Sequence, residues 1–110
     1  MGAKSRRKGA NGEREIAGIL TELLGQEVSR RLGQAREGGH DLNGTGPYIL
    51  EIKRRARIGG IHEWMAQAEA SCEPGASQAP VVAFRADGER WLVAMRIEDW
   101  AKLVREELAK

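Results

Sequence analysis

The chain has 110 residues, enough for one domain with a modest core, and 41% of them are hydrophobic and 31% charged, as in ordinary globular proteins. No apolar run approaches the roughly 18 residues of a membrane helix, and the charged N-terminus lacks the apolar stretch of a secretory signal. The single cysteine, Cys72, excludes an intramolecular disulfide framework and a cysteine-rich zinc site. We therefore expect a cytoplasmic protein with no membrane partner and no organic cofactor.

Charge is distributed unevenly, although the net charge is only +2. Residues 1–57 carry 12 Lys or Arg and 7 Asp or Glu, hence +5, whereas residues 58–110 carry 6 and 9, hence −3. The basic residues of the first half gather near positions 4–8, 30–36 and 53–57. Such clusters suit a polyanion such as nucleic acid. A solvated surface with a basic tail is the alternative that charge alone leaves open.

The first predicted element is a helix. Residues 1–8 show no apolar periodicity and are predicted to form a flexible basic arm ahead of a single domain at 9–110. The helix should begin near Asn11, its N-cap, and end at Gly25. Its inward stripe is predicted to be Ile16, Ile19, Leu20, Leu23 and Leu24. At 100° per residue, Glu13 lies about 50° from the centre of this stripe and Glu15 about 110°. Glu15 should therefore face more toward solvent than Glu13.

Strands and two further helices should follow. A short strand is expected over 28–32, then a glycine-rich loop over 33–46 with a strand end at 41–42, and a strand over 47–53. A helix over 61–72 and a central apolar strand over 80–85 should come next. A hairpin turn at 87–88 should lead to a strand over 90–96, and a helix over 98–110 should end the chain. Trp100, Leu103, Val104 and Leu108 are predicted to point inward from the last helix. The core is also the expected place of Trp64 and Trp91.

Glu51 and Lys53 form the most informative pair in the sequence. Because side chains alternate along a strand, both point to one face, while Leu50 and Ile52 point to the core. Metal-dependent phosphodiester cleavage would explain this placement, since carboxylates hold hard cations and a cation activates water. A neighbouring ammonium group can orient the water or stabilise developing charge. The alternative is a surface ion pair worth under about 1 kcal/mol.

Two further acids fit the same chemistry. Asp41 lies at the end of the loop before the strand, and Glu13 is the acid of the first helix that should point inward. Stabilisation of the helix dipole is the alternative role for Glu13, in the first turn of the predicted helix. For Arg85, at the end of the central strand, contact with phosphate and pairing with an acid both stay open.

The spacing Asp41…Glu51-x-Lys53, preceded by Lys8-Gly9-x-x-Gly12-Glu13-Arg14-Glu15, resembles the PD-(D/E)xK nucleases. More narrowly, residues 4–72 resemble archaeal and phage Holliday junction resolvases. His40 stands where that family usually has proline. The resemblance implies an α/β, restriction-endonuclease-like core, with a mixed sheet of about five strands flanked by helices.

The resemblance also implies roles for individual residues. Asp41, Glu51, Glu13 and the carbonyl of Ile52 would bind Mg²⁺ or Mn²⁺, and Lys53 would be the catalytic lysine. With the basic clusters, it assigns DNA contacts to Arg6, Arg7, Lys8, Arg14, Arg30, Arg31, Arg36, Arg54, Arg55 and Gln67.

The function expected from this sequence is a metal-dependent DNA endonuclease that makes paired nicks in four-way junctions. Paired nicking implies a homodimer, because a chain this short offers one site. The similar resolvases are dimers, and this resemblance implies that exposed apolar parts of the hairpin and the last helix would supply the interface. Two alternatives stay open: a nuclease for flaps or single nicks, and a non-catalytic DNA-binding protein on a nuclease fold. Only a catalytic protein needs the acid pair beside the phosphates of DNA.

Overall fold

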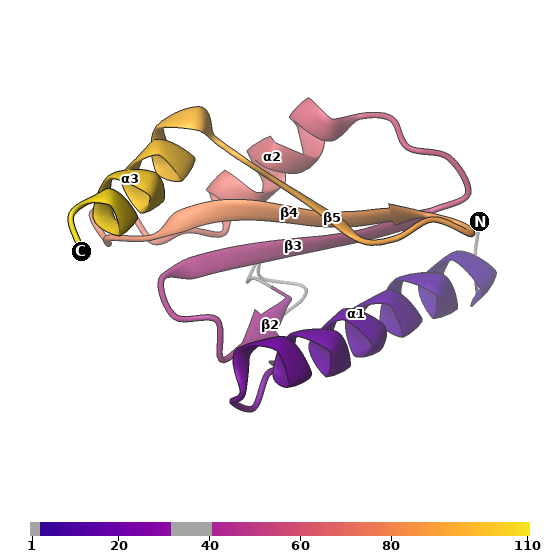
Figure 1. Ribbon diagram of the computed structural model, residues 1–110. Helices are drawn as coiled ribbons and strands as arrows, with labels where there is room; N and C mark the ends of the chain where they lie inside the picture. The colour runs from indigo at the N-terminus through magenta and orange to yellow at the C-terminus, as the bar shows by residue number, and fades with distance from the viewer. Residues whose placement is uncertain (1–2, 32–40) are drawn as a thin grey trace.

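Figure 1 shows the computed structural model of the protein, which describes residues 3–31 and 41–110, with side chains from Ala10 onward. The described part of the chain forms three helices and five strands. They are α1 (Ala3–Leu24), β1 (Ser29–Arg30), β2 (Leu42–Asn43), β3 (Tyr48–Arg55), α2 (Ile61–Ala70), β4 (Ala79–Ala86), β5 (Leu92–Met95) and α3 (Ile97–Leu108). No helix of the described part is long and apolar enough to cross a membrane.

A mixed three-stranded sheet forms the centre of the molecule. Its order is β3-β4-β5, with β3 parallel and β5 antiparallel to β4. The short strands β1 and β2 form a separate antiparallel pair, joined to β3 where the Asp41 N–H donates to the Leu50 carbonyl at 3.1 Å. The predicted α/β class is confirmed, as is the central place of the 80–85 strand. The expected sheet of about five strands is divided into three and two.

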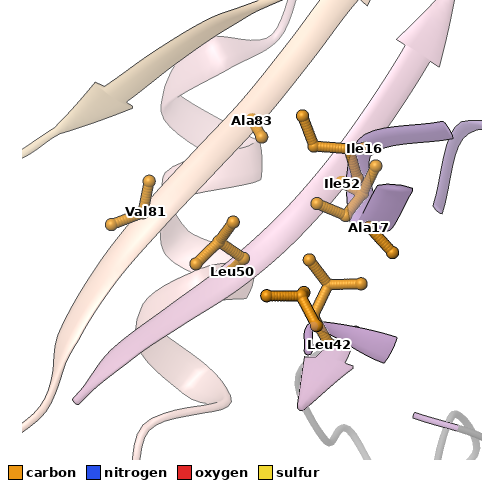
Figure 2. Packing of buried hydrophobic residues seen from close by; sticks show 8 residues of the cluster. Ile16, Ala17, Leu42, Leu50, Ile52, Val81 and Ala83 are labelled. Carbon is orange, nitrogen blue, oxygen red and sulfur yellow. The ribbon is translucent and has the colours of Figure 1, made fainter. Parts of the chain in front are cut away.

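Helices cover both faces of the three-stranded sheet, α1 on one and α2 on the other (Figure 1). Leu50 and Ile52 of β3 point toward α1, where they pack against Ile16 and Ala17 (Figure 2). Trp64 of α2 belongs to a second cluster on the opposite face. Because both faces of β4 are covered, the strand reads as a continuous apolar run, as buried parallel strands do.

The start of α1 differs from the prediction. The helix begins at Ala3, eight residues before the predicted N-cap Asn11, and its first turn contains no acidic residue. Alanine, lysine and arginine in this segment are strong helix formers. Glu13 therefore lies in the middle of α1, where the helix dipole does not account for it. The predicted mobility of the basic segment stays a prediction.

The predicted burial of the apolar stripes of α1 and α3 is confirmed only in part. Of the predicted α1 stripe only Ile16 is buried, next to Ala17, whereas Leu23 and Leu24 are exposed. In α3 no residue is buried, so the expectation that Trp100 and Leu108 point inward is wrong. Periodicity identifies the apolar side of a helix correctly, but it does not say whether another element covers that side.

Candidate functional site

Asp41 directly precedes β2 in the chain and is hydrogen-bonded to β3. Its backbone N–H donates to the Leu50 carbonyl at 3.1 Å, and its own carbonyl accepts from Arg31 N–H at 2.9 Å. Its side-chain Oδ2 accepts the Ile52 N–H at 2.7 Å. The carboxylate therefore lies against the edge of β3 between the positions of Glu51 and Lys53.

Glu51 and Lys53 form an ion pair within β3. Lys53 Nζ lies 3.2 Å from Glu51 Oε2, and the two side chains are only 13% and 16% exposed. The predicted sharing of one face is confirmed by this contact, since residues two apart on a strand lie on the same side. Such shielding separates the pair from an ordinary exposed surface ion pair, which is screened by water.

The environment of Asp41 works against its negative charge. The pKa of Asp41 is raised from its ordinary 3.8 to about 7, chiefly by burial and also by the negative charges of Glu51 and Glu13. The Ile52 N–H and the Lys53 ammonium act in the opposite direction, though not enough to offset the rise. Two neighbouring negative charges thus act on Asp41 in a partly buried place that lacks full compensation by cations.

Glu13 reaches this place from the middle of α1. Its Oε1 accepts from Arg30 Nε at 3.0 Å, so the helix acid is joined to the strand that was predicted to hold a basic residue toward DNA. Arg30 is therefore engaged with Glu13 in this structure. The negative charge of Glu13 also contributes to the raised pKa of Asp41.

A close approach between α1 and β3 places Glu13. A Cβ added at Gly12 would lie 3.1 Å from Arg54 Cβ, tighter than ordinary van der Waals contact. Arg54 Nε is buried without a hydrogen-bond partner and lies 3.7 Å from Asp87 Oδ1, too far for a good hydrogen bond. The electrostatic attraction to Asp87 remains, although the Asp87 side chain is 43% exposed and water partly screens the pair.

A second connection joins α1 to the β4–β5 hairpin, and sequence reasoning missed it. Glu15 Oε1 accepts from Trp91 Nε1 at 2.8 Å and from Arg85 Nε at 3.0 Å. Arg85 also lies over the Trp91 ring, 5.8 Å from its centroid. The open question about Arg85 is thus answered by pairing with an acid. Glu15 is more exposed than Glu13, 39% against 23% of the side chain, as predicted, but no local sequence signal links residues 15, 85 and 91.

The remaining predicted contact residues are spread over the surface. Arg14 is exposed and donates to Asn11 Oδ1 at 2.9 Å, and the Arg55 guanidinium lies 5.7 Å from the Trp64 ring centroid. Gln67 is exposed on α2. Arg36 and His40, and the side chains of Arg6, Arg7 and Lys8, lie outside the described residues.

The donor chemistry of the site fits a hard divalent cation, which prefers carboxylate and carbonyl oxygens. A cation beside Asp41 would relieve the unfavourable charge that raises its pKa. Within the described ranges, however, no group of three or more acidic, histidine or cysteine side chains is close enough to hold a metal ion. The fit therefore rests on Asp41 and Glu51, with backbone oxygens and water completing the coordination.

Comparison with known proteins gives one match. The sequence model of the phage putative PDDEXK endonuclease family matches residues 4–110, nearly the whole chain. No curated protein and no solved structure matches significantly. The family model spans Glu13, Asp41, Glu51 and Lys53 as well as the hairpin and α3.

Proposed function

The protein belongs to the phage putative PDDEXK endonuclease family, and on this premise we propose that it is a DNA endonuclease dependent on Mg²⁺ or Mn²⁺, with branched DNA as substrate. The observation that carries the proposal is the convergence at β3. The Asp41 carboxylate lies against Ile52 N–H, beside the shielded Glu51–Lys53 pair. A structural ion pair does not require a second, partly buried carboxylate at the same place.

Asp41 and Glu51, with the carbonyl of Ile52, would hold the cation, which when bound neutralises the scissile phosphate and acidifies a water molecule. Hydrolysis adds the water oxygen to phosphorus and breaks one phosphorus–oxygen bond of the backbone. The leaving oxygen takes up a proton. Negative charge on the phosphoryl oxygens is greatest in the transition state, so cations fixed beforehand are most effective there.

The chain's own residues have distinct tasks in this reaction. Lys53 would stabilise developing phosphoryl charge and orient the attacking water. Glu51 keeps the ammonium group of Lys53 in place through the 3.2 Å contact. Glu13, at 3.0 Å from Arg30, would support the cation site from α1 and orient Arg30 toward a phosphate. Arg54 and Arg55 continue β3 past the site and would bind the DNA backbone nearby.

Four-way junctions remain the proposed branched substrate, with two copies of the chain making paired nicks. The support is the resemblance of residues 4–72 to junction resolvases, together with the excess of positive charge in residues 1–57. Flap-cutting or single-nicking activity is the neighbouring alternative, and comparison of substrates separates them.

The test uses a labelled four-way junction and the linear duplexes that form its arms. Each is incubated with the protein in Mg²⁺, in Mn²⁺ and in chelator, beside Asp41→Asn. Glu22→Gln, which changes an exposed acid on α1, is the matched control. We expect symmetric, metal-dependent nicks in the junction, which are lost in Asp41→Asn and kept in Glu22→Gln.

Other outcomes redirect the proposal. Equal cutting of junction and duplex would keep the endonuclease and remove the junction specificity. Tight DNA binding without cutting in either metal, unchanged by Asp41→Asn, would favour a non-catalytic DNA-binding protein on a nuclease fold.

A further inference from the structure

Arg55, the last residue of β3, lies on the same side of the sheet as the Glu51–Lys53 pair. Ile52 points toward α1 (Figure 2), so the alternation of side chains along β3 turns Arg55 toward α2, on the other side (Figure 1). The Arg55 guanidinium confirms this orientation, because it lies 5.7 Å from the ring centroid of Trp64, in α2. Arg55 follows Lys53 by two residues, about 7 Å along the strand.

The Trp64 ring is fixed by its surroundings. Trp64 is only 8% exposed, and its ring centroid lies 6.2 Å from that of Phe84, the residue of β4 that pairs with Lys53. The chain returns from β3 to α2 through Gly60, whose φ of 73° suits glycine, and the Trp64 N–H donates to the Gly60 carbonyl at 2.9 Å. The ring beside Arg55 is therefore packed against the same strands that carry the candidate site.

Two contacts orient the Arg55 guanidinium, and neither neutralises it. One is the Trp64 ring, and in the other Nη1 donates to the Arg54 carbonyl at 3.1 Å. Within the described part of the chain Arg55 is exposed and forms no ion pair, whereas Arg30 is paired with Glu13 at 3.0 Å. An oriented cation without a counter-ion is suited to bind an anion from outside the chain.

We propose that Arg55 binds the phosphate next to the scissile one on the same DNA strand, and that Trp64 is the residue that positions it. This inference rests on the proposed function, in which Lys53 acts at the scissile phosphate. The separation of about 7 Å between Lys53 and Arg55 along β3 is similar to the separation of neighbouring phosphates in one strand. A planar guanidinium held on a ring can bind two phosphate oxygens at once. Holding this phosphate would keep the scissile bond aligned with Lys53.

The first test maps the cleaved bond in the four-way junction and then replaces one neighbouring phosphate by a neutral methylphosphonate. Two such substrates are made, one on the 5′ side and one on the 3′ side of the cleaved bond. With the unmodified junction, Arg55→Gln should lower kcat/KM by about tenfold or more, as loss of a hydrogen bond to a charged group does. With one of the two neutral substrates the wild type should fall by a similar factor, and Arg55→Gln should add less than about twofold.

Two further variants separate the orientation of the cation from its charge. Arg55→Lys keeps the charge but has no planar group to stack on the Trp64 ring, so it should recover little of the lost rate. Arg57→Gln is the matched control, since it removes an exposed arginine two residues further along the chain. Any loss that it causes should be the same factor on the unmodified and the neutral substrates.

The positioning role of Trp64 is tested against Phe84, which belongs to the same buried cluster but has no arginine over its ring within the described residues. Trp64→Leu should reduce the effect of the neutral phosphate on kcat/KM, because Arg55 is no longer held toward that phosphate. Phe84→Leu should keep this effect. The measured quantity is a ratio of rates on two substrates, so a loss of folded protein, which affects both equally, does not change it.

The outcomes separate this inference from the proposed function. A wild type that cuts none of the substrates in either metal would remove the endonuclease and this inference with it. Cutting by the wild type, with an equal loss in Arg55→Gln on all three substrates, would keep the endonuclease and overturn the contact between Arg55 and the neighbouring phosphate. Equal behaviour of Trp64→Leu and Phe84→Leu would overturn the positioning role of Trp64.

Discussion

The β3 site and helix α3 depart from an ordinary protein surface in opposite ways. At β3, carboxylates and an ammonium group are shielded from water, and the pKa of Asp41 is raised to about 7. At α3, large apolar side chains are exposed and no residue is buried. Shielded charge and exposed apolar surface are both unfavourable in an isolated chain. The arrangement at β3 is understandable if the proposed cation and DNA complete it.

The largest expected effect concerns the charge at the β3 site. Lys53→Met removes the ammonium group beside Glu51 and should lower the rate of DNA cleavage by about 10²- to 10³-fold, as loss of one electrostatic stabiliser does in other enzymes. Lys102→Met on α3 is the matched control and should cleave normally. Rates are measured under single-turnover conditions with saturating protein. Cleavage by Lys53→Met at the wild-type rate would remove Lys53 from the reaction.

The next effect is on stability and follows from the charge on Asp41. The pKa of Asp41 is higher in the folded protein, about 7, than its ordinary 3.8, so the folded state holds the proton more tightly. The stabilisation is complete below about pH 4 and is lost as the pH rises through 7. Asp41→Asn cannot ionise, and its amide oxygen can still accept from Ile52 N–H. In metal-free protein at pH 8 it should therefore be more stable than the wild type, by about 2–4 kcal/mol.

Thermal unfolding of both proteins across pH checks this expectation. The advantage of Asp41→Asn should disappear near pH 4, and added Mn²⁺ should stabilise the wild type more than the variant. A variant that is less stable than the wild type at pH 8 without metal would mean that the Asp41 charge is compensated. The proposed contrast between the two regions would then fail at β3.

Much of the fold was predictable from local pattern. The apolar run of β4, the turn after Asp87, and the alternation in β3 each reflect a short-range rule, and their elements occur nearly where predicted. The grouping of Glu51 with Lys53 followed from the two-residue period of a strand. These features need no knowledge of distant residues.

The features that could not be predicted from the sequence depend on contacts between segments that are far apart in the chain. The contacts of Glu15 with Arg85 and Trp91 span 70 and 76 positions, and no local sequence feature predicts them. The orientation of α3 was predicted inward because an apolar stripe usually faces its own core, and this protein leaves that stripe uncovered. The early start of α1 reflects helix-forming residues that a reading based on apolar periodicity ignored.

A smaller effect tests how closely α1 approaches the β3 site. Gly18 and Gly12 lie on the same helix, but an added Cβ meets nothing within 4 Å at Gly18 and lies 3.1 Å from Arg54 Cβ at Gly12. Gly18→Ala should stabilise the protein by about 0.5–1 kcal/mol through helix propensity. Gly12→Ala should fall short of that gain by about 1 kcal/mol or more. If urea unfolding shows the same increase in unfolding free energy for Gly12→Ala and Gly18→Ala, then α1 can move away from β3 freely.

The smallest expected effect concerns the hydrogen bond that fastens α1 to the hairpin. Trp91→Phe keeps an aromatic ring beneath Arg85 but removes the N–H that donates to Glu15 at 2.8 Å, which should cost about 1 kcal/mol of unfolding free energy. In a Glu15→Ala background the same substitution should cost much less, because the acceptor is already gone. Urea unfolding of the four proteins gives this coupling energy. If it is near zero, the contact does not hold α1 in place, and Glu13 is positioned by the packing of Gly12 and by Arg30 alone.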